Sequence, residues 1–377
     1  MSIELNHSKW KMYNFNDIFT EYSKSNTENL EQFTVGKYGL IPKSSEGYSY
    51  DVQKHKIFEP NTLLLGIGAE EVGVSTMERG CVSPIYNTFK ISDNFDSLFL
   101  KYLMPIIISQ NKCRISHIST RRNYEIEVSE LSKIQIALPP LEIQRKISSL
   151  LFDIDNKIEN QENLLNKYKD LKSSLLLKLF PIENEDVSKI RFNGFTDTWE
   201  QHKLSDIGSF AKGSGYSKSD LKDTGIPLIL YGRLYTNYET LIKEINTFAD
   251  EKQNSVYSKG GEVIIPASGE TTEDISIASV VQSPNVLLGG DLNVVQPYDF
   301  IDSVFLALSI TYSKTHYDLS KLAQGKTVVH IHNPDIKSVS FAFPNKVEQK
   351  KISNFFLSID NLITLHQCKP FYLNFSL

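Results

Sequence analysis

The chain has 377 residues, of which 40% are hydrophobic and 23% charged, an ordinary composition for a soluble globular protein of two or three domains. Its formal net charge of −5 weakly disfavours nucleic acid as a partner, although an acidic chain can still carry a locally basic cleft. No apolar run approaches the length of a membrane-spanning helix, and the N-terminus lacks the apolar core of a signal peptide. We therefore expect a cytoplasmic protein with no membrane contact, whose scattered cysteines are reduced thiols: Cys81, Cys113 and Cys368.

Residues 1–138 are predicted to form a first domain of mixed α/β type. Short runs of strand composition at residues 62–67 and 134–138 alternate with turn-rich segments, and the apolar stretch 98–109 can form a helix. Two consecutive prolines, Pro139 and Pro140, then interrupt the chain before the hydrophobic period changes.

A single long helix is predicted over residues 142–179, within a spacer segment that we assign to residues 139–182. The stretch contains no glycine or proline, and long or apolar side chains recur every three or four residues, at Ile147, Leu151, Ile154, Ile158, Gln161, Leu165 and Tyr168. Pro181 ends the pattern. Because a stripe this narrow buries little surface by itself, the helix requires a partner helix, as in a coiled coil.

Residues 183–343 are predicted to form a second mixed α/β domain, with strand-like runs at 226–231, 263–265, 286–288 and 339–343. A distal segment, residues 344–377, follows. Its helix is predicted from Val347 to Gln367, and Pro370 prevents it from continuing. The distal helix is therefore expected to be shorter than the central one.

The chain repeats itself. Residues 139–158 match residues 344–363 without a gap at an offset of 205, with nine of the twenty positions identical. A second match, at an offset of 189, pairs Trp10 and Asp17 with Trp199 and Asp206. A repeat this long is not a solenoid period. It predicts two similar halves, each a domain followed by a helix, related by a pseudo-two-fold axis.

The arrangement resembles the specificity subunit of type I restriction-modification systems. The resemblance is carried by LPPLEIQRKISSLL at residues 138–151, by LLLKLFP at residues 175–181 and by WEQHKLSDIGSF at residues 199–210. It covers the chain up to Gln367. The shortened distal helix departs from the family pattern, so the coiled coil should be shorter and partner docking on that side is in question.

The resemblance implies a non-catalytic subunit with two target-recognition domains. Each domain would read half of a bipartite sequence in double-stranded DNA, and the two long helices would lie antiparallel as a coiled-coil spacer. The implied partners are two methyltransferase subunits and restriction (motor) subunits. S-adenosylmethionine, ATP and magnesium would be bound by those partners, and no cofactor by this chain.

Residues that could contact DNA fall in two loops that are matched between the halves and in one further segment, residues 212–218. Arginine suits bidentate contact with guanine, and hydroxyl and lysine side chains suit phosphate. We predict DNA contact, against the alternatives of solvated turns and core-packed tyrosines, for Tyr38, Ser119, Thr120, Arg121, Arg122, Lys212, Ser214, Lys218, Tyr231, Arg233, Lys326 and Thr327.

Two other functions remain open from the sequence. A coiled-coil adaptor that binds protein would need the same helices but no DNA. The residues Asp335, Glu348 and Lys350 fit a PD…ExK nuclease pattern, in which two carboxylates hold a magnesium ion, but the first repeat lacks the lysine. His330 and His332 could supply two metal ligands, although no third ligand has a characteristic spacing.

Overall fold

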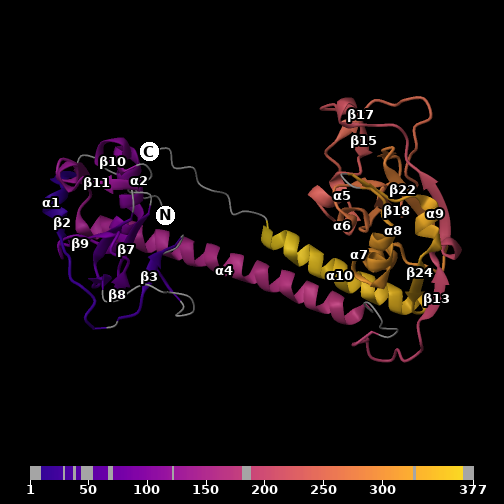
Figure 1. Cartoon of the computed structure of the whole chain (residues 1–377), viewed down its shortest axis with the longest axis horizontal. Coiled ribbons are helices and arrows are strands. Elements are labelled where there is room, and N and C mark those ends of the chain that lie inside the picture. The colour runs from indigo at the N-terminus through magenta and orange to yellow at the C-terminus, as the bar shows by residue number, and fades with distance from the viewer. Residues whose placement is uncertain are drawn as a thin grey trace. The chain divides into compact units, whose positions relative to one another are not determined.

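The computed structural model describes residues 10–28, 30–36, 40–43, 54–66, 71–120, 123–180, 188–325 and 328–367, with no side chains for 112–120 and 123–126. The chain divides into two compact units, Met1–Gln161 and Glu162–Leu377. Among the described residues, no helix is both long enough and apolar enough to cross a membrane. Each unit is described by itself below, with the labels of Figure 1.

Unit 1 is built on an antiparallel four-stranded sheet of order β2-β9-β6-β7, formed by Phe19–Glu21, Asn87–Ile91, Thr62–Leu65 and Val72–Ser75. A two-stranded ribbon pairs β1 (Lys11–Asn14) with β12 (Gln135–Leu138). The predicted strands at 62–67 and 134–138 are thus confirmed, as is the helix, which is longer than expected. The remaining elements are α1 (Phe15–Ile18), α2 (Ser97–Ile115), α3 (Val128–Leu131), and the pairs β3 (Phe33–Val35) with β4 (Leu40–Pro42), β5 (Lys56–Phe58) with β8 (Gly80–Val82), and β10 (Ser116–Thr120) with β11 (Asn123–Ile126).

Unit 2 repeats this plan on a five-stranded sheet of order β14-β22-β18-β20-β16, formed by Gly208–Lys212, Leu292–Pro297, Val263–Pro266, Ser279–Val281 and Leu241–Ile242. Its ribbon pairs β13 (Glu200–Lys203) with β24 (Ser340–Phe343). The predicted strands of this half are confirmed. The other elements are β15 (Ile226–Ile229), β17 (Phe248–Ala249), β19 (Ser268–Gly269), β21 (Leu287–Leu288), β23 (Val329–His330), α5 (Arg233–Thr236), α6 (Thr272–Ile275), α7 (Ser303–Tyr312), α8 (Lys314–Leu322), α9 (Asn333–Ser338), and the 3-10 helices η4 (Leu204–Asp206) and η5 (Lys218–Asp220).

The two sheets share one topology over four strands. In each unit the first sheet strand pairs antiparallel with the last, the last with a central strand, and that strand with the next along the chain. The repeat in the sequence therefore corresponds to a repeated fold. The additional residues of unit 2 include β16, which joins β20 in parallel, and the β17-β15-β21 sheet. The pseudo-two-fold relation of the halves stays a prediction.

Two long helices complete the fold, α4 (Leu141–Leu179, 39 residues) and α10 (Lys346–Gln367, 22 residues), close to their predicted bounds. Within unit 2 they are antiparallel and side by side (Figure 1). Tyr168 stacks on His366 with ring centroids 5.4 Å apart, and Lys172 contacts Asp360 at 2.5 Å. Leu176 and Leu179 share one core with the start of α10. The predicted antiparallel pair is thus confirmed for this part of α4.

The predicted stripe on α4 is half-buried for most of its length. Ile147 packs against the core of unit 1, and Leu151, Ile158, Leu165 and Tyr168 are each partly covered. Ile154 is the exception, with 38% of its surface exposed.

Candidate nucleic-acid interface

The two long helices begin in the same way, at buried glutamines in equivalent positions. Gln144 on α4 is 2% exposed and Gln349 on α10 is 0% exposed. Each side-chain Nε2 donates to the carbonyl of the proline five residues earlier, at 2.8 Å in both helices. Each Oε1 accepts from a domain backbone amide, that of Asp96 at 3.0 Å and that of Asp302 at 2.8 Å. One repeated set of hydrogen bonds therefore joins each domain to its helix.

The same two aspartates also start the helix that packs on each sheet. Oδ1 of Asp96 accepts from the amide of Phe99 at 2.7 Å, and Oδ1 of Asp302 accepts from the amide of Phe305 at 3.0 Å. A carboxylate at this position satisfies one of the amides that a helix N-terminus leaves unpaired. Each aspartate thus connects the sheet-covering helix to the long helix. The gapless sequence match begins at Pro139, so sequence comparison missed this pair.

The first predicted loop lies at a hairpin. Strands β10 and β11 pair antiparallel from Ser116 with Ile126 to Thr120 with Asn123. In unit 2, Gln324 and His330 bridge across the equivalent loop, next to Gly325 with a φ of +140°. The residues themselves lie outside the described part of the chain, or their side chains do: Tyr38, Ser119, Thr120, Arg121, Arg122, Lys326 and Thr327.

The segment from Lys212 to Lys218 is packed, in contrast to the loose loop that its glycines suggested. Ser214 Oγ accepts from the amide of Val256 at 3.0 Å. A Cβ on Gly213 would lie 1.9 Å from the carbonyl oxygen of Gly289, so only glycine fits this close approach of two backbones. Lys212 and Lys218 are exposed, and they are the two predicted residues of this segment whose charges reach the surface.

The predicted residues Tyr231 and Arg233 make contacts inside unit 2. Tyr231 packs on the cluster that contains Ile229 and Leu234. The Arg233 Nη2 donates to Glu239 Oε2 at 2.5 Å and to the Glu244 carbonyl at 2.8 Å, and the side chain is 14% exposed. A guanidinium engaged in this way holds the loop after α5, and base contact by Arg233 stays a prediction.

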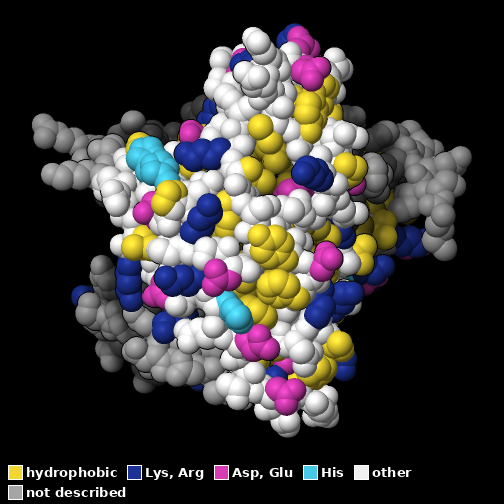
Figure 2. All heavy atoms as spheres, turned by 90° about the vertical axis from the view of Figure 1, so that its right-hand side faces the viewer, with side chains coloured by type: hydrophobic (Ala, Val, Ile, Leu, Met, Phe, Trp, Pro, Cys, Tyr) yellow, Lys and Arg dark blue, Asp and Glu magenta, His cyan; other side chains and the backbone are white. Residues whose placement is uncertain are grey.

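A polar cluster that the prediction omitted lies around the end of β14. His330 and His332 are exposed and stacked, with ring centroids 6.4 Å apart, and His330 Nδ1 is 3.0 Å from Ser268 Oγ. Asn333 donates to the Ala211 carbonyl at 2.9 Å, next to Lys212 in the chain, and its side-chain oxygen is buried without a hydrogen-bond partner. Figure 2 shows one face of the molecule, over which Lys and Arg side chains are spread among apolar and acidic ones. On the face shown, the Lys and Arg side chains form no single patch, so we identify the candidate surface by the exposed residues His330, His332 and Lys212.

Comparison with known proteins decides the family. The model of the type I restriction modification DNA specificity domain matches residues 7–169 and again residues 196–371, once for each half of the chain. The chain belongs to this family. It is a DNA specificity subunit of a type I restriction-modification system, and both halves carry the specificity domain.

Relatives agree with this assignment. The specificity subunit of the type I restriction enzyme MjaVIII from Methanocaldococcus jannaschii is 26% identical over 247 residues, which is 62% of this chain but only 56% of that relative. The putative MjaX specificity subunit of the same organism is 22% identical over 362 residues, covering 90% of this chain and 76% of the relative. The crystal structure of a type I S subunit from M. genitalium has the same fold, with a TM-score of 0.62 at 15% identity over 97% of this chain and 93% of that one.

The residues of the nuclease pattern have structural roles in this specificity subunit. Glu348 is 0% exposed and forms a two-point ion pair with Arg191, at 3.0 Å and 2.5 Å. Asp335 accepts from the amide of His332 at 3.0 Å and so starts α9. Neither carboxylate is placed to hold magnesium, so the nuclease interpretation is wrong. Among the described residues, no group of three or more His, Cys, Asp or Glu side chains could bind a metal ion.

Proposed function

We propose that the chain reads a two-part sequence in double-stranded DNA, one half-site by each recognition domain. The observation that carries the proposal is the repeated attachment of each domain to a long helix, through Gln144 with Asp96 and through Gln349 with Asp302. Two domains fixed in the same way to two antiparallel helices suit a target of two half-sites with a defined gap, because the protein then sets their separation geometrically.

The proposed DNA contacts come from three places. Arg121 and Arg122, which lie between β10 and β11 in the sequence, and Lys326 and Thr327, which follow Gly325, would contact base edges and phosphate. Exposed lysines at Lys212 and at η5 would bind phosphate, which positions the protein without reading sequence. The exposed histidines beside Lys212 add donors and acceptors at the same end of the sheet. Together these groups supply both phosphate and base contacts.

We infer that the chain acts within a larger enzyme. Two methyltransferase subunits would bind S-adenosylmethionine and methylate adenine, and restriction (motor) subunits would bind ATP and magnesium and cleave. This chain would bind none of these cofactors and would perform recognition alone. We place this subunit in the cytoplasm, because it must reach chromosomal DNA to act on it. A purely protein-binding adaptor would not need the specificity domain that both halves match.

Reconstitution tests the proposal. The chain is combined with the methyltransferase subunits of its own system and S-adenosylmethionine, and methylated adenines are mapped on plasmid DNA. We expect one bipartite motif with a single gap. Replacing residues 1–138 with the first domain of another family member should change one half-site and leave the other half-site and the gap unchanged.

The control is the same exchange made in residues 183–343, which should change the opposite half-site. Methylation without a bipartite motif, or a change in both half-sites after one exchange, would refute the proposal. A protein partner bound equally well with and without DNA, in the absence of methylation, would instead support the adaptor.

A further inference from the structure

Both long helices carry an aspartate at the same place in the repeat. Asp155 on α4 and Asp360 on α10 are related by the offset of 205. Asp155 lies eight residues beyond Ile147, which packs on the core of unit 1, and Asp360 lies eight residues beyond Ile352, which packs on the core of unit 2. At ~1.5 Å per residue, each aspartate is about 12 Å farther along its helix than the isoleucine.

In unit 1 the aspartate accepts a hydrogen bond from the sheet-covering helix. Tyr102, on α2, donates its hydroxyl to Asp155 Oδ2 at 2.8 Å. Burial, and then the neighbouring carboxylate, raise the pKa of the Tyr102 hydroxyl, so it keeps its proton at every physiological pH. Ile154 beside Asp155 is exposed, so apolar packing does not extend to this point of the helix.

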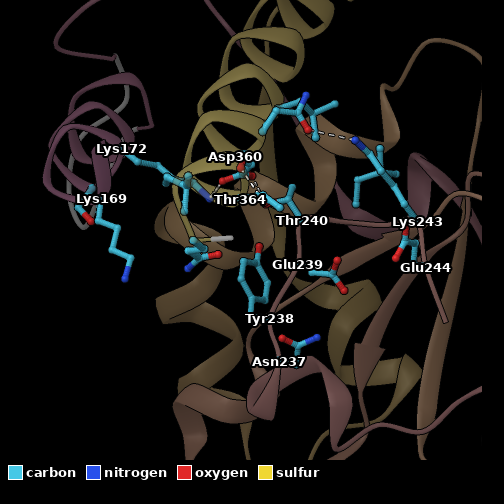
Figure 3. A pocket seen from close by; sticks show the side chains of 16 residues that line it. Lys169, Lys172, Asn237, Tyr238, Glu239, Thr240, Lys243, Glu244, Asp360 and Thr364 are labelled. Carbon is cyan, nitrogen blue, oxygen red and sulfur yellow. Dashed lines mark hydrogen bonds and ion pairs between the residues drawn. The ribbon is translucent and has the colours of Figure 1, made fainter. Parts of the chain in front are cut away.

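In unit 2 the donors are different, although the aspartate is the same. Thr240 Oγ1, in the segment between α5 and β16, donates to Asp360 Oδ2 at 3.2 Å, and Lys172 on α4 donates to Oδ1 at 2.5 Å (Figure 3). Lys243 contacts the next helix residue, Asn361, at 3.2 Å. The aspartate therefore contacts both its own recognition domain and the second helix of the coiled coil.

These polar contacts lie beside a cavity. The space between the segment Asn237–Glu244, α4 and α10 has a volume of about 640 Å³, and Thr240, Lys172 and Asp360 line it. Ile359 and Ile363 of α10 pack on the core of unit 2 at this level, and the hydrogen bonds to Asp360 and Asn361 add polar contacts between the segment and α10. In both units the repeated aspartate thus adds a polar contact between the recognition domain and its helix.

A body attached at one point of a rod can still rock, whereas attachment at two separated points fixes its angle. The helix-start glutamines and the core provide the first point, and the aspartates provide the second. The equivalent aspartates of the two helices contact different parts of the two recognition domains. Asp155 accepts from Tyr102 on α2, whereas Asp360 accepts from Thr240, just before β16. This difference indicates that the position on the helix matters, rather than one inherited packing arrangement.

We propose that Asp155 and Asp360 are positioning residues that fix the tilt of each recognition domain on its helix, and so restrict the DNA gap that the subunit accepts. The inference rests on the proposed function. It concerns the separation of half-sites and not their sequences, because neither aspartate belongs to the candidate DNA contacts.

The test measures gap selection. The subunit and its methyltransferase partners methylate duplexes that keep both half-sites and have the natural gap, or a gap one base pair shorter or longer. Thr240→Val removes the donor hydroxyl, while Thr240→Ser keeps it. We expect Thr240→Val to lower the preference for the natural gap about five- to tenfold, since a hydrogen bond to a charged group is lost, and Thr240→Ser to restore it. Tyr102→Phe should act in the same direction from the other half.

Two further measurements make the result decisive. Asp153→Asn changes an exposed carboxylate two residues before Asp155 and should leave gap preference unchanged. The melting temperature of each variant is measured in parallel, because a merely structural role would lower it and reduce methylation equally at all gaps. An unchanged gap preference in both Tyr102→Phe and Thr240→Val would overturn the inference. Failure of the proposed function is distinguishable, since the wild-type protein itself would then show no gap preference.

Discussion

Replacing Gln349 by leucine tests how the second domain is held on α10. The side chain is fully buried and makes three hydrogen bonds: Oε1 accepts from the Asp302 amide at 2.8 Å, and Nε2 donates to the carbonyls of Pro344 at 2.8 Å and Phe300 at 3.2 Å. Leucine has a similar volume and leaves all three backbone groups without a partner. Each unsatisfied buried group costs about 1–3 kcal/mol, and partial relaxation offsets some of this. We expect Gln349→Leu to lower the free energy of unfolding of unit 2 by about 3 kcal/mol.

The chain offers a convenient reporter for this measurement. It has two tryptophans, Trp10 in unit 1 and Trp199 in unit 2, and Trp199 contacts the ring of Phe305 with centroids 5.6 Å apart. In a Trp10→Phe background, urea unfolding followed by tryptophan fluorescence therefore reports on unit 2. Gln201→Leu, at an exposed position of β13, is the matched control and should change stability by less than ~0.5 kcal/mol. A loss below ~1 kcal/mol for Gln349→Leu would refute the argument that this glutamine holds the helix start.

Four further single substitutions have defined outcomes. Arg191→Met leaves the Glu348 carboxylate buried without its partner and should destabilise unit 2 by about 3–5 kcal/mol in the same urea assay, whereas adding Glu348→Leu should recover most of the loss. Phe356→Ala removes a fully buried ring from the core shared by α4 and α10 and should cost about 3–5 kcal/mol, with a loss of helix content by circular dichroism if the pair separates. Lys212→Ala and Lys218→Ala should weaken DNA binding by the assembled enzyme to the same extent on every sequence, and each should reduce the salt slope by about one, while a change in the preferred sequence would contradict a phosphate role.

Much of the fold could be predicted from local patterns. The heptad spacing and the absence of glycine and proline predicted α4 to within one residue of its start, and short runs of strand-forming residues located β18 and β24. The internal match predicted two domains of one topology, because two domains that are attached to their helices in the same way need the same residues at the attachment. The helix and the strands depend on residues close together in the sequence, so local patterns are enough to predict them.

The candidate site was predicted less completely, because its contacts join residues far apart in the chain. Gly213 suggested a loose loop, yet it packs against Gly289, the residue directly after β21. Arg233 has the chemistry of a guanine reader, but a glutamate six residues away and the loop carbonyl of Glu244 take its hydrogen bonds. His330 could be interpreted from the sequence as a metal ligand or as a satisfied or DNA-facing histidine, and its place beside Ser268 depends on the pairing of β19 with β23. None of these contacts leaves a periodic signal in the sequence.

The two halves differ in an informative way. Several of the nine positions that are identical between the repeats attach a domain to its helix, among them Gln144 with Gln349, Ile147 with Ile352, and Asp155 with Asp360. The residues proposed to face DNA do not match, since the sequence Ser119-Thr120-Arg121-Arg122 in one half corresponds to Gln324-Gly325-Lys326-Thr327 in the other. Attachment is a mechanical requirement that is the same for both half-sites, whereas recognition must differ if the two half-sites differ in sequence. The pattern of identity within this one chain therefore separates the residues that set geometry from those that set specificity, and it assigns the aspartates to the first group.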